Sequence, residues 1–142
     1  MMSELMDMEL WERLESVNLS KEAFKHREHI RAAFVALSKS ADLAEGALLF
    51  RRALKQSAHA HGADQKYNET MTWAYLVLIH ERMHRGKFES SQQFLAAYPE
   101  LLNHRRVLGH YYDVETLIQS PLARRLFLLP GSEQLADARE PR

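Results

Sequence analysis

Residues 71–79, Met-Thr-Trp-Ala-Tyr-Leu-Val-Leu-Ile, form the stretch that decides the fold class. Wound as a helix, this stretch is apolar on nearly every side, which is typical of a helix at the centre of a domain. It lies within a longer helical pattern over about residues 65–85, and it is far shorter than the roughly 20 apolar residues of a membrane span. We therefore predict a central and most buried helix at 65–85.

Helical spacing also governs the rest of the chain. Apolar residues recur at intervals of three and four in three further long segments, about residues 3–16, 20–38 and 42–61. Ser20 and Asp42 are placed as N-caps of the second and third segments. Helix-stopping and helix-starting residues then divide the remainder into short helices, with signals at Gly62, Gly86, Ser90 or Ser91, Pro99, Asp113 and Ser120-Pro121.

No stretch alternates with the two-residue period of a β-strand. The fold prediction is an all-α, single-domain helical bundle over 1–142, with four longer helices, short C-terminal helices and no sheet. Residues 131–142 are polar, and we expect them to form a loose tail.

Composition limits the classes of function. Lys plus Arg equals Asp plus Glu at 19 each, so no overall positive charge favours nucleic acid as a partner. The absence of cysteine excludes disulfides, thiolate zinc sites and a cysteine nucleophile. The N-terminus alternates acidic and apolar residues and does not resemble a signal peptide. We expect a soluble cytoplasmic protein without a membrane partner, and homo-oligomerisation is left open.

The first candidate constellation is a pair of histidines, His26 and His29, in the second helical segment. A spacing of three places both imidazoles on one helix face, and Ala33 and Leu37 continue that face toward the core. The pair is suited to metal binding or to acid–base chemistry. The alternative is two buried histidines, each bonded to a carbonyl or carboxylate of a neighbouring helix.

The second constellation is the polar block 66–73, Lys-Tyr-Asn-Glu-Thr-Met-Thr-Trp, which opens the central helix. A helix start with unpaired amides and several polar side chains is suited to line a ligand pocket. Asn68 is a candidate N-cap, and Glu69 suits the helix dipole. Capping and helix-packing hydrogen bonds are the structural alternative for this block.

The third constellation is His80-Glu81-Arg82-Met83-His84, an H-E-x-x-H sequence. On a helix this motif places two zinc ligands one turn apart, with the glutamate as general base. Lys87 and Ser90 stand where the longer metzincin signature has glycine and histidine. Glu81-x-x-His84 also matches one half of a di-metal helical-bundle site. The structural alternative is a chance match, with solvent-side histidines favoured by the negative end of the helix dipole.

Three blocks together resemble a family of small, uncharacterised bacterial helical proteins. The blocks are F-x-H-x-x-H-x-R at 24–31, K-Y-[NH]-x-T-x-T at 66–72 and Y-Y…S-x-x-A-R…P at 111–130. Relatives can carry histidine at the position of Asn68, and the H-E-x-x-H motif is not part of the pattern. The resemblance covers most of the chain and implies a site formed by these blocks, without naming its chemistry.

The leading hypothesis is a small-molecule enzyme or ligand-binding protein with a buried His/Tyr/Thr pocket between the second and fourth helices. A divalent metal, zinc or iron, is a candidate cofactor. The candidate catalytic residues are His26, His29 and Tyr67. The candidate substrate-binding residues are Arg31, Asn68, Thr70, Thr72, Trp73 and Arg124. The candidate metal ligands are His26, His29, His80, Glu81 and His84. The alternatives are a non-enzymatic helical interaction module and a minimal H-E-x-x-H zinc hydrolase.

Overall fold

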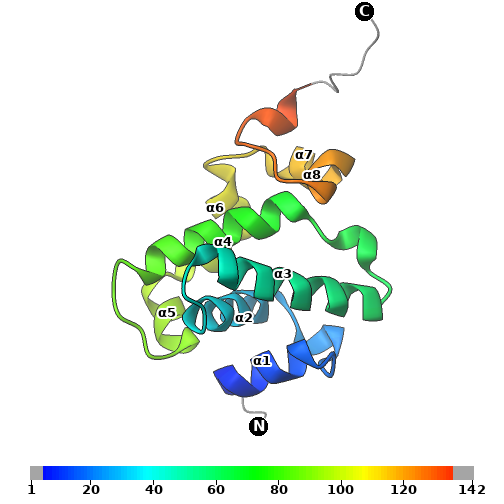
Figure 1. Ribbon diagram of the computed structural model, residues 1–142. Coiled ribbons are helices and arrows are strands. Elements are labelled where there is room, and N and C mark those ends of the chain that lie inside the picture. Colours follow the sequence, from blue (N-terminus) through cyan, green and yellow to red (C-terminus); the bar gives the residue numbers. More distant parts are fainter. Residues whose placement is uncertain (1–4, 136–142) are drawn as a thin grey trace, which may run out of the picture.

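The computed structural model describes residues 5–135, and within them it contains helices and turns but no strand (Figure 1). The all-α prediction is confirmed. The helices in chain order are α1 (Asp7–Glu15), α2 (His26–Ser38), α3 (Leu43–Ala60), α4 (Glu69–Met83), α5 (Ser91–Ala97), α6 (His104–Gly109), α7 (Val114–Gln119) and α8 (Pro121–Arg125). Short 3-10 turns lie at Lys21–Ala23, Asp64–Lys66, Pro99–Leu102 and Ser132–Gln134.

Helix α2 lies at the centre of the bundle and contacts α1, α3, α4 and α5. Helix α4 crosses it, and the small helices α7 and α8 pack beside α4 at the end of the molecule opposite α1 (Figure 1). Every residue from 30 to 37 in α2 is buried, whereas Val77 in the middle of α4 is 46% exposed. The prediction that the 65–85 helix is the most buried one is therefore wrong, and α2 has that place.

Close packing of α3 on α2 depends on a glycine. A Cβ added at Gly46 would lie 2.7 Å from the Leu37 side chain and 3.0 Å from its Cα. Small residues of α2, including Ala32 and Ala36, are fully buried and allow its neighbours to approach. Close approach of this kind is why α2 can be surrounded on all sides.

The N-caps follow the sequence signals. Asp42, Asn68, Ser90 and Ser120 each accept a hydrogen bond from a backbone amide in the first turn of the helix that follows. Gly62 has a φ of 66°, the left-handed conformation expected after the end of α3.

Two helices begin later than their apolar patterns. The segment after Ser20 forms only one 3-10 turn, and non-helical backbone at Phe24 and Lys25 delays α2 to His26. Likewise Asp64–Lys66 is a separate turn, so α4 begins at Glu69. In both cases a local capping bond interrupts a pattern whose spacing alone is continuous.

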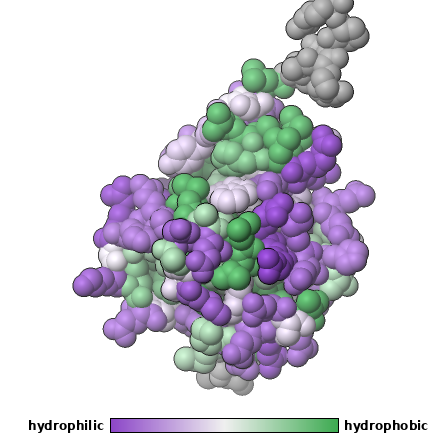
Figure 2. Space-filling view, viewed as in Figure 1, coloured by the Kyte–Doolittle hydropathy of each residue, from purple (hydrophilic) through white to green (hydrophobic). Residues whose placement is uncertain are grey.

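The core has a large and a small part. The large part fills the space between α1 and α6 and includes the fully buried Trp11, Phe94 and Leu76. The small part lies under α7 and α8 and consists of Tyr112, Leu117, Ala123 and Leu128. Exposed apolar side chains gather at this same end (Figure 2): Leu122, Leu126, Phe127, Leu129 and Leu135.

The end of the described chain is packed onto α7. Glu133 is buried and accepts hydrogen bonds from the amides of Asp113 and Gly131. The part of the expected loose tail at 136–142 lies outside the described residues. Among residues 5–135, no helix combines the length and the apolar character that crossing a membrane requires.

Candidate functional site

Two adjoining cavities lie between α2, α3 and α4, and we name them by their linings. The polar chamber, about 570 Å³, includes Lys21, Lys66 and His61 in its wall. The apolar chamber, about 240 Å³, is bounded mainly by hydrocarbon side chains of α2, α3 and α4. Both chambers share four lining residues, His29, Leu54, Met71 and Thr72. The two chambers therefore adjoin, and we name the pair the two-chamber pocket. The polar chamber alone has a volume in the range of small-molecule sites.

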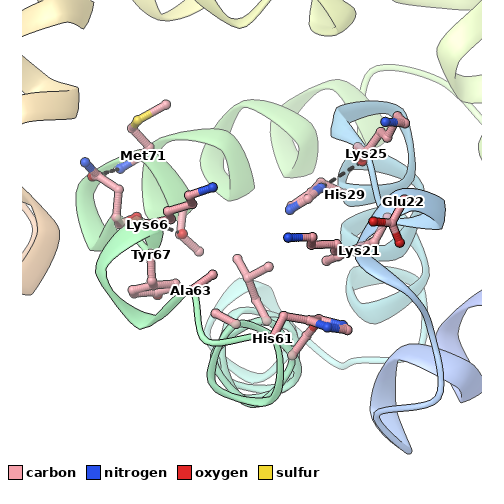
Figure 3. Close-up of a pocket in the computed structure, with 15 residues that line it drawn as sticks. Lys21, Glu22, Lys25, His29, His61, Ala63, Lys66, Tyr67 and Met71 are labelled. Carbon is pink, nitrogen blue, oxygen red and sulfur yellow. Dashed lines mark hydrogen bonds between the residues drawn. The ribbon is translucent and has the colours of Figure 1, made fainter.

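His29 stands at the junction of the chambers. Its ring stacks on Phe24, with ring centroids 3.9 Å apart, and its Nδ1 lies 2.8 Å from the Lys25 carbonyl oxygen. A carbonyl oxygen only accepts, so Nδ1 carries the hydrogen and Nε2 of the neutral ring has a free lone pair. Figure 3 shows the ring directed into the polar chamber.

The environment of His29 favours the neutral imidazole. Burial lowers its pKa below the ordinary 6.5, and the charge of His26 acts in the same direction. The bond to the Lys25 carbonyl acts in the opposite direction but does not reverse the shift. At neutral pH His29 is thus an acceptor, ready to take a hydrogen bond or a proton from a molecule in the pocket.

This environment predicts a pH dependence of stability. Because the folded-state pKa of His29 lies below the unfolded value, its contribution is fully present above pH 6.5 and is lost as pH falls through the folded-state pKa. We expect the free energy of unfolding by urea to fall between about pH 7.5 and about pH 5. His29→Phe, which retains the stacked ring, should reduce that fall. An unchanged slope in the variant would contradict the assignment, and the Hε1 titration of His29 by NMR checks it directly.

His26 faces the apolar chamber and belongs to a shared hydrogen-bond cluster. Its Nε2 lies 2.9 Å from the Leu101 carbonyl oxygen and 3.2 Å from the Tyr75 hydroxyl, which itself donates to that carbonyl at 2.9 Å. The ring of His104 lies 5.4 Å from that of His26. Burial and the charge of His26 lower the pKa of His104, and burial raises the pKa of Tyr75. His26 and Tyr75 therefore both donate to the Leu101 carbonyl, and these two bonds hold α2 and α4 to the turn at Pro99–Leu102.

Helices α2 and α4 pack together as expected, but the side chains that meet between them differ in part from those predicted. We expected His26 and His29 to lie near Tyr67, Thr70 and Trp73. His29 and Tyr67 do line the same polar chamber. The polar partner of His26, however, is Tyr75, which the sequence analysis did not select because it lies within the apolar run 71–79.

Tyr67 and Trp73 both bind a residue that the sequence analysis assigned to the helix dipole, Glu69. The Tyr67 hydroxyl donates to its Oε1 at 2.6 Å, Trp73 Nε1 donates to its Oε2 at 3.1 Å, and Arg51 Nε lies 2.8 Å from Oε1. Burial alone would raise the pKa of Glu69, but these three donors outweigh burial and lower it. Burial and the bond to Glu69 raise the pKa of Tyr67. The cluster is internally satisfied and joins α3 to the start of α4.

Asn68, Thr70 and Thr72 face backbone groups. Asn68 caps α4 through Oδ1 and donates from Nδ2 to the Leu117 carbonyl at 3.0 Å. Thr70 is fully buried and binds the backbone of the α8 region, and the Thr72 hydroxyl donates to the Asn68 carbonyl at 2.8 Å. Asn68 and Thr72 also line the pocket, whereas Thr70 does not.

The two candidate arginines lie away from His29. Arg31 is buried at the opposite face of α2, where it pairs with Asp7. Arg124 Nε donates to the Ile118 carbonyl at 3.3 Å, and its side chain borders a separate cavity beside Tyr67 and Glu69. Neither arginine lines the two-chamber pocket.

The H-E-x-x-H residues lie near the C-terminal end of α4, outside the pocket. The rings of His80 and His84 are 4.4 Å apart, and His84 Nδ1 lies 3.0 Å from the His80 carbonyl oxygen. Burial and the charge of His84 lower the pKa of His80. Glu81 forms an exposed ion pair with Arg85. In the described part of the chain, no three His, Asp or Glu side chains are grouped so that they could hold a metal ion.

The pocket contains residues outside the candidate sites predicted from the sequence: Lys21, His61, Tyr75 and His104. The chain matches no family model, no curated protein and no solved structure. The resemblance carried by the three sequence blocks therefore stays a prediction.

Proposed function

We propose that the protein binds a small organic molecule in the two-chamber pocket, with His29 as the group that accepts a hydrogen bond from it. The observation that carries this proposal is the fixed tautomer of His29. Phe24 and the Lys25 carbonyl hold the ring, so that Nε2 is presented to a cavity. An acceptor with a lowered pKa is also suited to act as a general base, which is the enzymatic form of the proposal.

The form of the pocket supports the same conclusion. A small-molecule site typically combines mainly apolar walls with a few placed polar groups. Here Phe50, Leu54 and Met71 contribute apolar walls from two helices, and Lys66 and His29 contribute polar groups to the polar chamber. The pocket also lies between the helices of a bundle, a common position for ligand sites.

A helical interaction module remains the second candidate function, and one observation favours it. The side chains of the Glu69 and His26 clusters hydrogen-bond to one another and to backbone groups of the protein. In that case their role is to hold the helices in register, and binding takes place on the apolar surface near α8. The two candidate functions predict different binding sites: a ligand would shift NMR signals of the two-chamber pocket in the first case and signals near α8 in the second.

A fragment screen by NMR on the full chain tests the proposal. The probes are small aromatic and aliphatic compounds, neutral and charged, added to protein with labelled methionine and leucine methyl groups. We expect a subset that carries an N–H or O–H donor to shift Met71 and Leu54, and to bind about tenfold more weakly to His29→Phe, the loss of one hydrogen bond of about 1.4 kcal/mol.

His84→Phe is the matched control, because it makes the same replacement on the exposed end of α4. It should leave the binding of these fragments unchanged. The proposal is overturned if no fragment shifts Met71 or Leu54, or if His29→Phe and His84→Phe bind the fragments as the wild type does.

A further inference from the structure

We infer that the molecule bound in the two-chamber pocket is an amphipathic aliphatic carboxylate, with its head in the polar chamber and its hydrocarbon part in the apolar chamber. This inference rests on the proposed function and names the class of ligand. An ionised carboxylate has no donor of its own, so for this ligand His29 Nε2 takes up a proton and donates a hydrogen bond to the head. It is argued from the positive charge of one chamber, the mainly hydrocarbon wall of the other, and the position of His29 between them.

The polar chamber carries an excess of positive charge. Its wall contains three lysines, Lys21, Lys25 and Lys66, and a single acidic residue, Glu22. Figure 3 shows the ammonium groups of Lys21 and Lys66 reaching into the same space from opposite sides, with the His29 ring beside them. Nitrogen-bearing side chains from three segments of the chain therefore line this chamber.

Neither Lys21 nor Lys66 has an ion-pair partner among residues 5–135. Their charges are therefore available to an anion in the chamber. Both side chains are exposed, so each contributes an attraction that is modest and sensitive to salt. The overall charge of the chain is zero, which makes this concentration of lysines local to the chamber.

The apolar chamber presents mainly hydrocarbon, because the donors of three of its polar residues are used within the protein. His104, whose pKa is lowered by burial, is a further polar ring in its wall. The Tyr75 hydroxyl and His26 Nε2 both bind the Leu101 carbonyl, and Thr72 donates to the Asn68 carbonyl. The rest of the wall is formed largely by apolar side chains: Ile30, Ala33, Phe50, Leu54, Met71, Leu76 and Ile79. Hydrocarbon gains free energy in such a space, whereas a polar group would lose its bonds to water.

His29 connects the two parts of the ligand. A carboxylate head near the lysines lies close to Nε2, and its charge favours the protonated imidazole. The protein would then take up a proton as the carboxylate binds, and the pKa of His29 would rise toward or above its ordinary value. A neutral molecule in the pocket would leave that pKa low, so the titration of His29 distinguishes the two kinds of ligand.

Titration with two homologous series tests the inference. The probes are the unbranched carboxylates from acetate to dodecanoate and the matching primary alcohols, and binding is followed by calorimetry and by the shifts of the Met71 methyl and the His29 ring. Affinity for the carboxylates should rise about fourfold per methylene until the apolar chamber is full. Octanoate should bind several-fold more tightly than octanol, less so at high ionic strength, and should raise the pKa of His29.

Variants separate the head from the hydrocarbon part. Lys66→Met retains the aliphatic stem and should weaken octanoate about three- to fivefold without weakening octanol. Lys87→Met, outside both chambers, is the matched control and should change neither. Ala33→Leu fills part of the apolar chamber and should weaken octanoate more than butanoate. Because the chain-length series uses the wild-type protein, the test does not depend on this core variant folding.

The possible failures are distinguishable. If octanol binds as tightly as octanoate and shifts Met71, the carboxylate head is ruled out while the pocket stands. If acetate binds as tightly as octanoate, the hydrocarbon part is ruled out. If neither series binds in the pocket but donor fragments do, the ligand class is wrong and the proposed function stands. If no probe of any kind shifts Met71 or Leu54, both are overturned.

Discussion

Replacing Arg31 with methionine is expected to lower the free energy of unfolding by about 3–5 kcal/mol, the cost of breaking a buried ion pair from one side. The Arg31 side chain is 1% exposed. Its Nη2 lies 3.0 Å from Asp7 Oδ1 and also donates to the Leu5 carbonyl, and its Nε donates to Ser91 Oγ at 2.8 Å. Asp7 also accepts from the amide and the hydroxyl of Ser91.

These bonds join α1, α2 and α5 through charged and polar groups within an apolar surround. Methionine fills much of the space of the arginine stem but leaves the Asp7 carboxylate without its cation. The Asp7 side chain is only 19% exposed, so water replaces that partner poorly. The loss is measured as the difference in the free energy of unfolding by urea between Arg31→Met and the wild-type protein.

Arg13→Met is the matched control, because its ion pair with Glu9 lies on the surface at 3.4 Å. Exposed pairs of this kind contribute little, so the control should change stability by less than about 1 kcal/mol. In the double variant Asp7→Asn/Arg31→Met, the loss should be smaller than the sum of the single losses. Equal effects of Arg31→Met and Arg13→Met would show that the buried pair does not stabilise the fold.

Replacing Thr70 with valine is expected to cost about 1–3 kcal/mol and to loosen the α8 region selectively. The Thr70 hydroxyl lies 3.0 Å from the Ala123 carbonyl oxygen and 2.7 Å from that of Leu126, and it accepts the Leu128 amide at 3.1 Å. Thr70 is fully buried. Valine keeps the shape of the side chain but leaves the backbone groups without their partner.

Thr72→Val makes the same change two residues along α4 and serves as the control. The Thr72 hydroxyl donates to the Asn68 carbonyl, which also accepts the backbone amide of Thr72. Its loss should cost less than the loss at Thr70. Hydrogen exchange at the Leu128 amide should become faster in Thr70→Val and stay near the wild-type rate in Thr72→Val. Equal exchange in both variants would contradict the role assigned to Thr70.

The polar block 66–73 shows why residue types alone did not establish the site. Tyr67 and Trp73 both donate to Glu69, whose further partner, Arg51, comes from α3. Thr70 binds backbone carbonyls of the chain near α8. Arg51 lies 18 residues before Glu69, and Leu126 lies 56 residues after Thr70. No local pattern reports such pairings, because they depend on how the helices pack.

The helical class, several of the caps and the inward face of His26 and His29 follow from local patterns in the sequence. Capping and periodicity are local, since they involve residues within about one turn of each other. The tertiary structure decided that α2 rather than α4 is central, because small side chains on α2 and Gly46 on α3 permit close approach. The pocket also depends on the tertiary structure, because Lys21, Lys66 and Met71 come near His29 only when the helices have packed together.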